Sequence, residues 1–71
     1  MDRLYVGSKI RMLRRKKKLT QKELAKLVDV SPASIAAYET GDKIPRDDVK
    51  EKMAKVLDST VTFIFFENDI N

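Results

Sequence analysis

Basic side chains crowd the first third of this chain and give it its most evident binding chemistry. Residues 1–26 hold ten Lys or Arg against two acids, a net charge of +8, whereas residues 27–71 hold five against nine, a net charge of −4. A polyanion would therefore meet one strongly basic end of the molecule. DNA suits that charge, although an acidic protein partner or simple solubility would leave the same asymmetry.

Catalysis and metal binding have little support in the composition. The 71 residues include no Cys and no His, which removes thiolate ligands, disulfides and the side chain that titrates near neutral pH. The sequence has no glycine-rich phosphate loop, and the carboxylates of Asp47, Asp48 and Glu51 fit helix-surface charge. We expect no enzymatic activity, no cofactor and no metal.

The apolar residues are too dispersed for a membrane protein. No apolar run approaches the ~20 residues that a spanning helix needs, and no hydrophobic signal segment follows Met1. We expect no membrane partner and a cytoplasmic location.

Two short helices joined by a tight turn are predicted in the middle of the chain. Thr20 and Glu23 form a capping-box pattern, which predicts a helix over Gln21–Val28. Ser31 is placed to cap a second helix over Pro32–Thr40, which ends at a glycine. So short a connection makes the two helices cross steeply around a shared apolar contact, as in a helix-turn-helix.

Three runs in this part of the chain carry a resemblance: Leu19-Thr20-Gln21-x-x-Leu24-Ala25, Val30-Ser31-x-x-x-Ile35 and Glu39-x-Gly41-x-x-x-Pro45. They resemble the Cro and phage-repressor (XRE-like) helix-turn-helix family, and the match extends from about Ile10 to Phe66. The resemblance implies an all-α fold, a compact four- or five-helix lambda-repressor-like DNA-binding domain with its helix-turn-helix at the second and third helices.

Flanking helices are predicted on both sides of this motif. The first runs from Tyr5 to about Lys17, with Asp2 and Ser8 as candidate caps, and the fourth runs from about residue 46 or 47 to Leu57. The whole chain, 1–71, is expected to be one domain, with an ordered core over 5–66 and a frayed tail over 67–71. Aspartates replace the usual family glycines at positions 29 and 58, so both turns should form with a small strain.

The segment after the fourth helix is ambiguous. Its β-branched and aromatic residues favour a strand, whereas the resemblance implies a short fifth helix, which we prefer. Two roles are open for its aromatic side chains: closing the monomer core, or forming a dimer interface. The candidate interface residues are Phe63, Phe65 and Phe66.

The resemblance also implies how the domain would hold DNA, with the third helix in the major groove. An ion pair between Arg14 and Glu39 is expected to fix the angle between the first helix and the motif. The implied phosphate contacts are Gln21, Lys22, Ser34, Thr40, Lys43 and Arg46. The implied base-reading positions are Pro32, Ala33, Ser34, Ala36 and Ala37.

The base-reading positions depart from the usual chemistry of sequence readout. Specific readout relies on Arg, Lys, Asn or Gln, each good bidentate contact contributing ~1–3 kcal/mol of discrimination, and this helix has none of them. We expect a sequence-specific Cro-type regulator that binds double-stranded DNA as a homodimer. The alternative is a protein-interaction module that acts on a partner repressor, or on a toxin as its antitoxin, with weak DNA specificity of its own.

Overall fold

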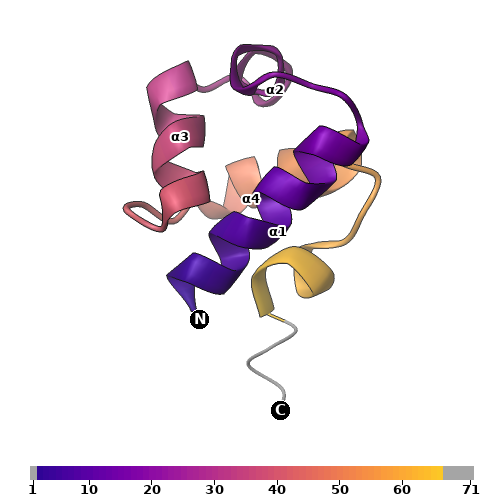
Figure 1. Cartoon of the computed structure of the whole chain (residues 1–71). Coiled ribbons are helices and arrows are strands. Elements are labelled where there is room, and N and C mark those ends of the chain that lie inside the picture. The colour runs from indigo at the N-terminus through magenta and orange to yellow at the C-terminus, as the bar shows by residue number, and fades with distance from the viewer. Residues whose placement is uncertain (1, 67–71) are drawn as a thin grey trace.

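Helices make up the regular structure of the protein, described by a computed structural model over residues 2–66. Four α-helices are followed by one π-helical turn (Figure 1). They are α1 Arg3–Lys16, α2 Gln21–Val28, α3 Pro32–Thr40, α4 Asp47–Val56 and η1 Thr62–Phe66. No strand occurs within residues 2–66. The expected all-α fold is confirmed, whereas the predicted frayed tail, 67–71, lies outside the described residues.

The two helices of the central motif have the predicted bounds because their start signals are local. The Thr20 hydroxyl accepts the backbone N–H of Glu23 at 3.0 Å, and the Glu23 carboxylate accepts the backbone N–H of Thr20 at 2.8 Å. The Ser31 hydroxyl accepts the backbone N–H of Ser34 at 3.1 Å. Each cap satisfies amides that the first helical turn leaves without a partner.

α1 begins two residues earlier than predicted, because Asp2 rather than Ser8 caps it. The Asp2 carboxylate accepts the backbone N–H groups of Leu4 and Tyr5 at 3.0 and 3.2 Å. At its other end α1 stops one residue short of the prediction, at Lys16, and α4 likewise ends one residue early.

Three of the connections use a non-glycine residue in the left-handed conformation. Asp29 (φ 60°) and Asp58 (φ 55°) adopt it as predicted, and Gly41 (φ 87°) ends α3 in the same region. Lys18 (φ 59°) also adopts it, between α1 and α2, which the sequence did not indicate. Non-glycine residues pay a steric cost there, so the tight turns are held by the packing around them.

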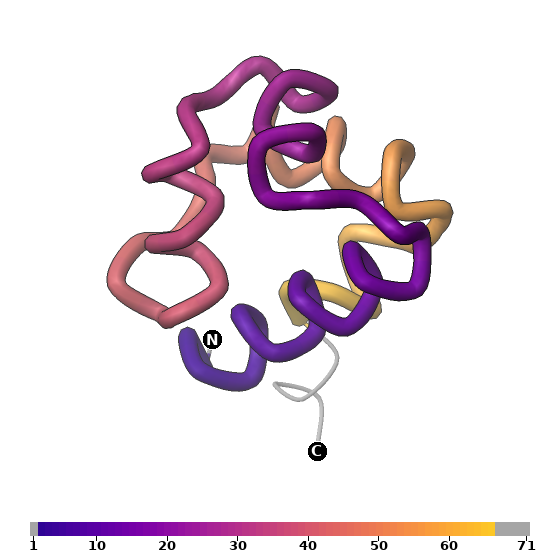
Figure 2. Tube along the Cα trace, turned by 45° about the horizontal axis from the view of Figure 1, so that its top comes forward, coloured from indigo at the N-terminus to yellow at the C-terminus, as the bar shows by residue number. Residues whose placement is uncertain are grey.

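One apolar core lies between the helices. α1 packs across α3, α2 packs on α3 and α4, and η1 lies beside α1 in both views (Figures 1 and 2). Every element contributes to the core. Its side chains with no exposed surface are Ile10, Leu24, Val28, Ile35, Met53, Ile64 and Phe65.

The segment after α4 is a helical turn and not a strand. The Thr60 hydroxyl caps it by accepting the backbone N–H of Phe63 at 3.0 Å, and the turn buries Ile64 and Phe65 completely. The prediction of Phe65 as a dimer-interface residue is therefore wrong, because its ring closes the monomer core. Phe63 and Phe66 keep 36% and 38% of their surface exposed.

Two lysines fasten η1 to the helices. Lys9 in α1 donates to the carbonyl of Phe63, and its Nζ lies 5.2 Å from the ring centroid of the same residue. Lys50 in α4 places its Nζ 5.0 Å from the ring centroid of Phe66. Both side chains are largely buried, so these cations act on the aromatic turn where water screens them little.

Candidate nucleic-acid interface

α3 presents the residues expected to read bases at its N-terminal end. Its inward side buries Ile35, Tyr38 and Glu39. Pro32 and Ala33 are exposed, whereas Ser34, Ala36 and Ala37 are half-buried. The side chains on the outward surface of α3 are thus small, and the Ser34 hydroxyl accepts a hydrogen bond from the Ser31 hydroxyl at 3.0 Å.

A groove beside α3 gathers several of the expected phosphate contacts. Ser34, Lys43 and Arg46 line it together with Ser31 and Tyr38, around a volume of about 380 Å³. Lys43 and Arg46 are exposed. Arg46 also lies near a helix-surface acid, its Nε being 3.6 Å from the carboxylate of Asp48. Two cations and a hydroxyl thus line one concave surface, together with the apolar residues Val30, Ile44 and Val49. The two cations make it a suitable place for a phosphate.

The other expected phosphate contacts lie apart from this groove. Lys22 is exposed on the first turn of α2. The Thr40 hydroxyl donates to the carbonyl of Ala37 at 3.2 Å. Gln21 does not extend freely into solvent, since its side-chain amide donates to Glu39 at 3.1 Å.

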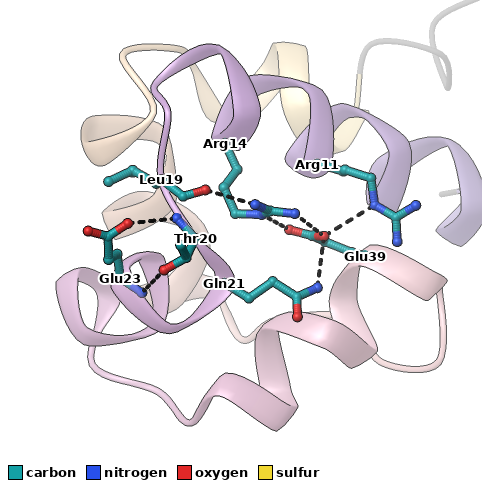
Figure 3. A network of polar contacts seen from close by, with 7 residues as sticks. All are labelled: Arg11, Arg14, Leu19, Thr20, Gln21, Glu23 and Glu39. Carbon is teal, nitrogen blue, oxygen red and sulfur yellow. Dashed lines mark hydrogen bonds and ion pairs between the residues drawn. The ribbon is translucent and has the colours of Figure 1, made fainter.

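Glu39 is the centre of a polar network that joins α1, α2 and α3 (Figure 3). The Arg14 guanidinium grips it with two nitrogens, Nε 2.6 Å from Oε2 and Nη2 3.0 Å from Oε1. A third nitrogen of Arg14 donates to the carbonyl of Leu19 at 2.8 Å, in the connection before α2. The structure thus contains the expected pair, and the same guanidinium also fixes the start of the helix-turn-helix.

The ionisation of Glu39 follows from these contacts. Burial alone would raise the pKa of Glu39, but the hydrogen bonds from Arg14, Gln21 and Arg11 and the charge of Arg14 outweigh burial and lower it. In turn, the hydrogen bond with Glu39 raises the pKa of Arg14. Glu39 is therefore a carboxylate at neutral pH, with its charge compensated inside the fold.

Two members of this region were not predicted from the sequence. Arg11 donates from Nε to Glu39 Oε1 at 3.3 Å. Gly7 lies against the backbone of α3, and a Cβ atom there would fall 2.7 Å from the carbonyl oxygen of Tyr38. Positions 7, 11 and 14 are spaced as one stripe of a helix, and that spacing was the available signal.

The motif itself carries an exposed apolar side chain, on α2. Leu27 keeps 55% of its surface exposed, as its position just before the core residue Val28 predicted.

Within residues 2–66, no group of three or more acidic, His or Cys residues is placed to hold a metal ion. In the same part of the chain, no helix combines the length and the apolarity that crossing a membrane requires.

The helix-turn-helix family model matches residues 10–64 of the chain. Among curated proteins, the chain is 35% identical over 66 residues to the HTH-type transcriptional regulator DicA of Escherichia coli, a match that covers 93% of this chain and 49% of DicA. It is 44% identical over 52 residues to multiprotein-bridging factor 1 of Candida albicans, which covers 73% of this chain and 34% of that protein. The chain thus spans about half and about a third of the lengths of these relatives.

Two solved structures share the arrangement of helices. The clp gene regulator ClgR of Corynebacterium glutamicum superposes with a TM-score of 0.85 at 26% identity, over 97% of this chain and 73% of that one. The P22 c2 repressor, crystallised with a synthetic operator, superposes with a TM-score of 0.84 at 28% identity, over 86% of this chain and 92% of that one.

Proposed function

This chain belongs to the Cro and phage-repressor helix-turn-helix family, and from that premise we propose that it is a DNA-binding transcriptional regulator whose α3 enters the major groove. The observation that carries the proposal is the groove beside α3, which Lys43, Arg46 and Ser34 help to line. A phosphate held there would lie next to the exposed N-terminal end of α3. The P22 c2 repressor, solved with an operator, supports the same use of this fold.

Phosphate contacts and base contacts have different roles in this proposal. Lys43 and Arg46, with Lys22 and the Thr40 region, supply electrostatic affinity that does not depend on sequence. The face formed by Pro32, Ala33 and the alanines after it offers methyl groups and no bidentate donor. Discrimination then rests on thymine methyl groups and on DNA shape.

A homodimer on a two-fold operator completes the proposal, since a single small α3 reads few base pairs. Phe63 and Phe66 are the described tail residues with exposed aromatic surface, and they remain our candidates for that contact. A regulator of this kind acts in the cytoplasm, where the bacterial chromosome lies.

The second candidate function is a protein-interaction module acting on a partner repressor or a toxin. Two observations favour it: Leu27 is exposed on α2, within the motif, and α3 carries no long hydrogen-bonding side chain on its outward surface. Similarity to a protein named multiprotein-bridging factor 1 points the same way.

Fluorescence anisotropy on duplex DNA separates the two functions. Duplexes enriched from a random pool serve as the specific probe, and titrations at two salt concentrations with competitor DNA measure affinity and salt slope. A regulator retains a preferred duplex under competition, whereas a module gives a weak, sequence-blind, salt-sensitive signal. Lys43→Ala should weaken binding equally on all duplexes and lower the salt slope by about one, with Lys55→Ala on α4 as the matched control.

A further inference from the structure

Arg11 has more hydrogen-bonding capacity than the fold uses. A guanidinium carries five N–H groups, and Arg11 donates only from Nε, to Glu39 at 3.3 Å, in the contacts among residues 2–66. Its side chain is 43% exposed, whereas the Glu39 side chain is fully buried. The terminal nitrogens of Arg11 therefore stand at the surface while Nε is tethered to a buried carboxylate.

Glu39 does not need Arg11 for its own neutralisation. Arg14 already holds the carboxylate with two nitrogens, at 2.6 and 3.0 Å, and Gln21 adds a third donor at 3.1 Å. Two guanidinium charges thus face one carboxylate charge. Arg11, Arg14 and Glu39 together have one net positive charge. Arg11 is the more exposed of the two arginines, so this charge lies at its guanidinium, near the surface.

The position of this surplus charge points toward an anion. Arg11 from α1 and Gln21 from the first turn of α2 meet at the same carboxylate oxygen, Oε1 (Figure 3). The first turn of α2 has the positive pole of that helix, and its capping box satisfies backbone donors at the helix start. Glu39 thus holds the two terminal nitrogens of Arg11 beside Gln21, which is already expected to contact the DNA backbone.

We propose that Arg11 is a further phosphate-binding residue of the DNA interface, with Glu39 as the positioning residue that aims its guanidinium fork. The inference rests on the proposed function and adds to it a contact made from α1, outside the helix-turn-helix itself. Arginine suits this role because its planar fork binds phosphate with two hydrogen bonds while Nε stays engaged. The contact strengthens binding to every duplex and does not choose among sequences.

The test compares Arg11→Ala, Arg11→Lys and the control Lys52→Ala, an exposed lysine of α4, by anisotropy on the preferred duplex and an unrelated duplex. Arg11→Ala should weaken binding to both by the same factor and lower the salt slope by about 0.9. Between 50 and 200 mM salt, wild-type affinity should then fall about 3.5-fold more than that of Arg11→Ala, because the salt concentration rises fourfold. Arg11→Lys should keep the slope and recover part of the affinity, because it restores the charge without the fork.

Folding is measured alongside binding. Arg11→Ala should keep the far-UV circular dichroism and cooperative melting of the wild type, because Arg14 still pairs with Glu39. The inference fails if Arg11→Ala binds DNA with wild-type affinity and salt slope while Lys43→Ala shows the weaker affinity and the lower slope expected of it. That outcome leaves the proposed function standing. It also fails if Arg11→Ala unfolds. If the wild type itself shows no salt-dependent DNA binding, the proposed function and this inference fall together.

Discussion

Replacing Gly7 by alanine should destabilise the domain although alanine is the better helix former. Gly7 is buried in α1, against the backbone of α3. An added Cβ atom would lie 2.7 Å from the carbonyl oxygen of Tyr38 and 2.8 Å from the carbonyl carbon of Glu39. Both are backbone atoms, so no side chain can rotate away, and α1 and α3 must move apart.

The size of the effect comes from two opposing contributions. Glycine inside a helix is worse than alanine by ~1 kcal/mol, which favours the variant. Forcing an extra carbon into a close contact costs ~1–3 kcal/mol, and the upper end applies here because the obstacle is backbone. The net loss is about 2 kcal/mol, which for a domain of this size lowers the melting temperature by roughly 8–16 °C.

Thermal and urea unfolding followed by circular dichroism measure this loss. The matched control is Ser8→Ala, one position along α1 at an exposed site, which should be neutral or slightly stabilising because it adds helix propensity without a contact. A Gly7→Ala variant as stable as the wild type would show that α1 and α3 do not approach as closely as described. Its DNA affinity should also fall, because the separation pulls Arg14 away from Glu39.

The remaining predictions concern the ion pair, the cap and the tail. The folded-state pKa of Glu39 lies below its ordinary value of 4.5, so the carboxylate stabilises the fold above that pH, and this contribution is lost as pH falls through the lowered pKa. The urea midpoint of the wild type should therefore decline below about pH 4.5. Glu39→Gln should have a lower urea midpoint at pH 7, and its midpoint should decline less with acid. Thr20→Ala removes the α2 cap and should cost ~1 kcal/mol of unfolding free energy in urea; no change in the urea midpoint would show that the cap contributes nothing. Phe65→Asp should abolish cooperative unfolding because its ring is fully buried, whereas Phe66→Asp should remain folded and shift a dimer toward monomer in sedimentation; a folded Phe65→Asp would contradict the core assignment.

Local signals were sufficient for the central motif. The bounds of α2 and α3 follow from a capping box at Thr20, a capped Pro32 start and a closing Gly41, each of which acts on neighbouring backbone within one turn. The Arg14–Glu39 pair was expected from the family pattern alone, because its members are 25 positions apart and no local rule relates them. The aspartate turns at 29 and 58 formed because tertiary packing outweighs their modest backbone cost.

Contacts between distant elements were harder to predict. Gly7 and Arg11 lie on the face of α1 that packs against α3. Their roles can be recognised only once that packing is known, because a single sequence does not give the distance between two helices. At the tail, β-branched and aromatic propensity competed with burial. The segment forms a helical turn because in that conformation Ile64 and Phe65 are buried in the core. The same turn places the carbonyl of Phe63 where Lys9 donates a hydrogen bond to it.

The small side chains of α3 have a thermodynamic consequence for the proposed complex. Alanine and proline lose essentially no rotamer entropy when they are immobilised, so inserting Pro32, Ala33 and their neighbours into a groove orders almost nothing on the protein side. The flexible partners are the lysines and arginines around them, whose attraction to phosphate is driven by release of counterions. Association of this domain with a duplex should therefore be favoured by entropy at low ionic strength and show a small reaction enthalpy in calorimetry.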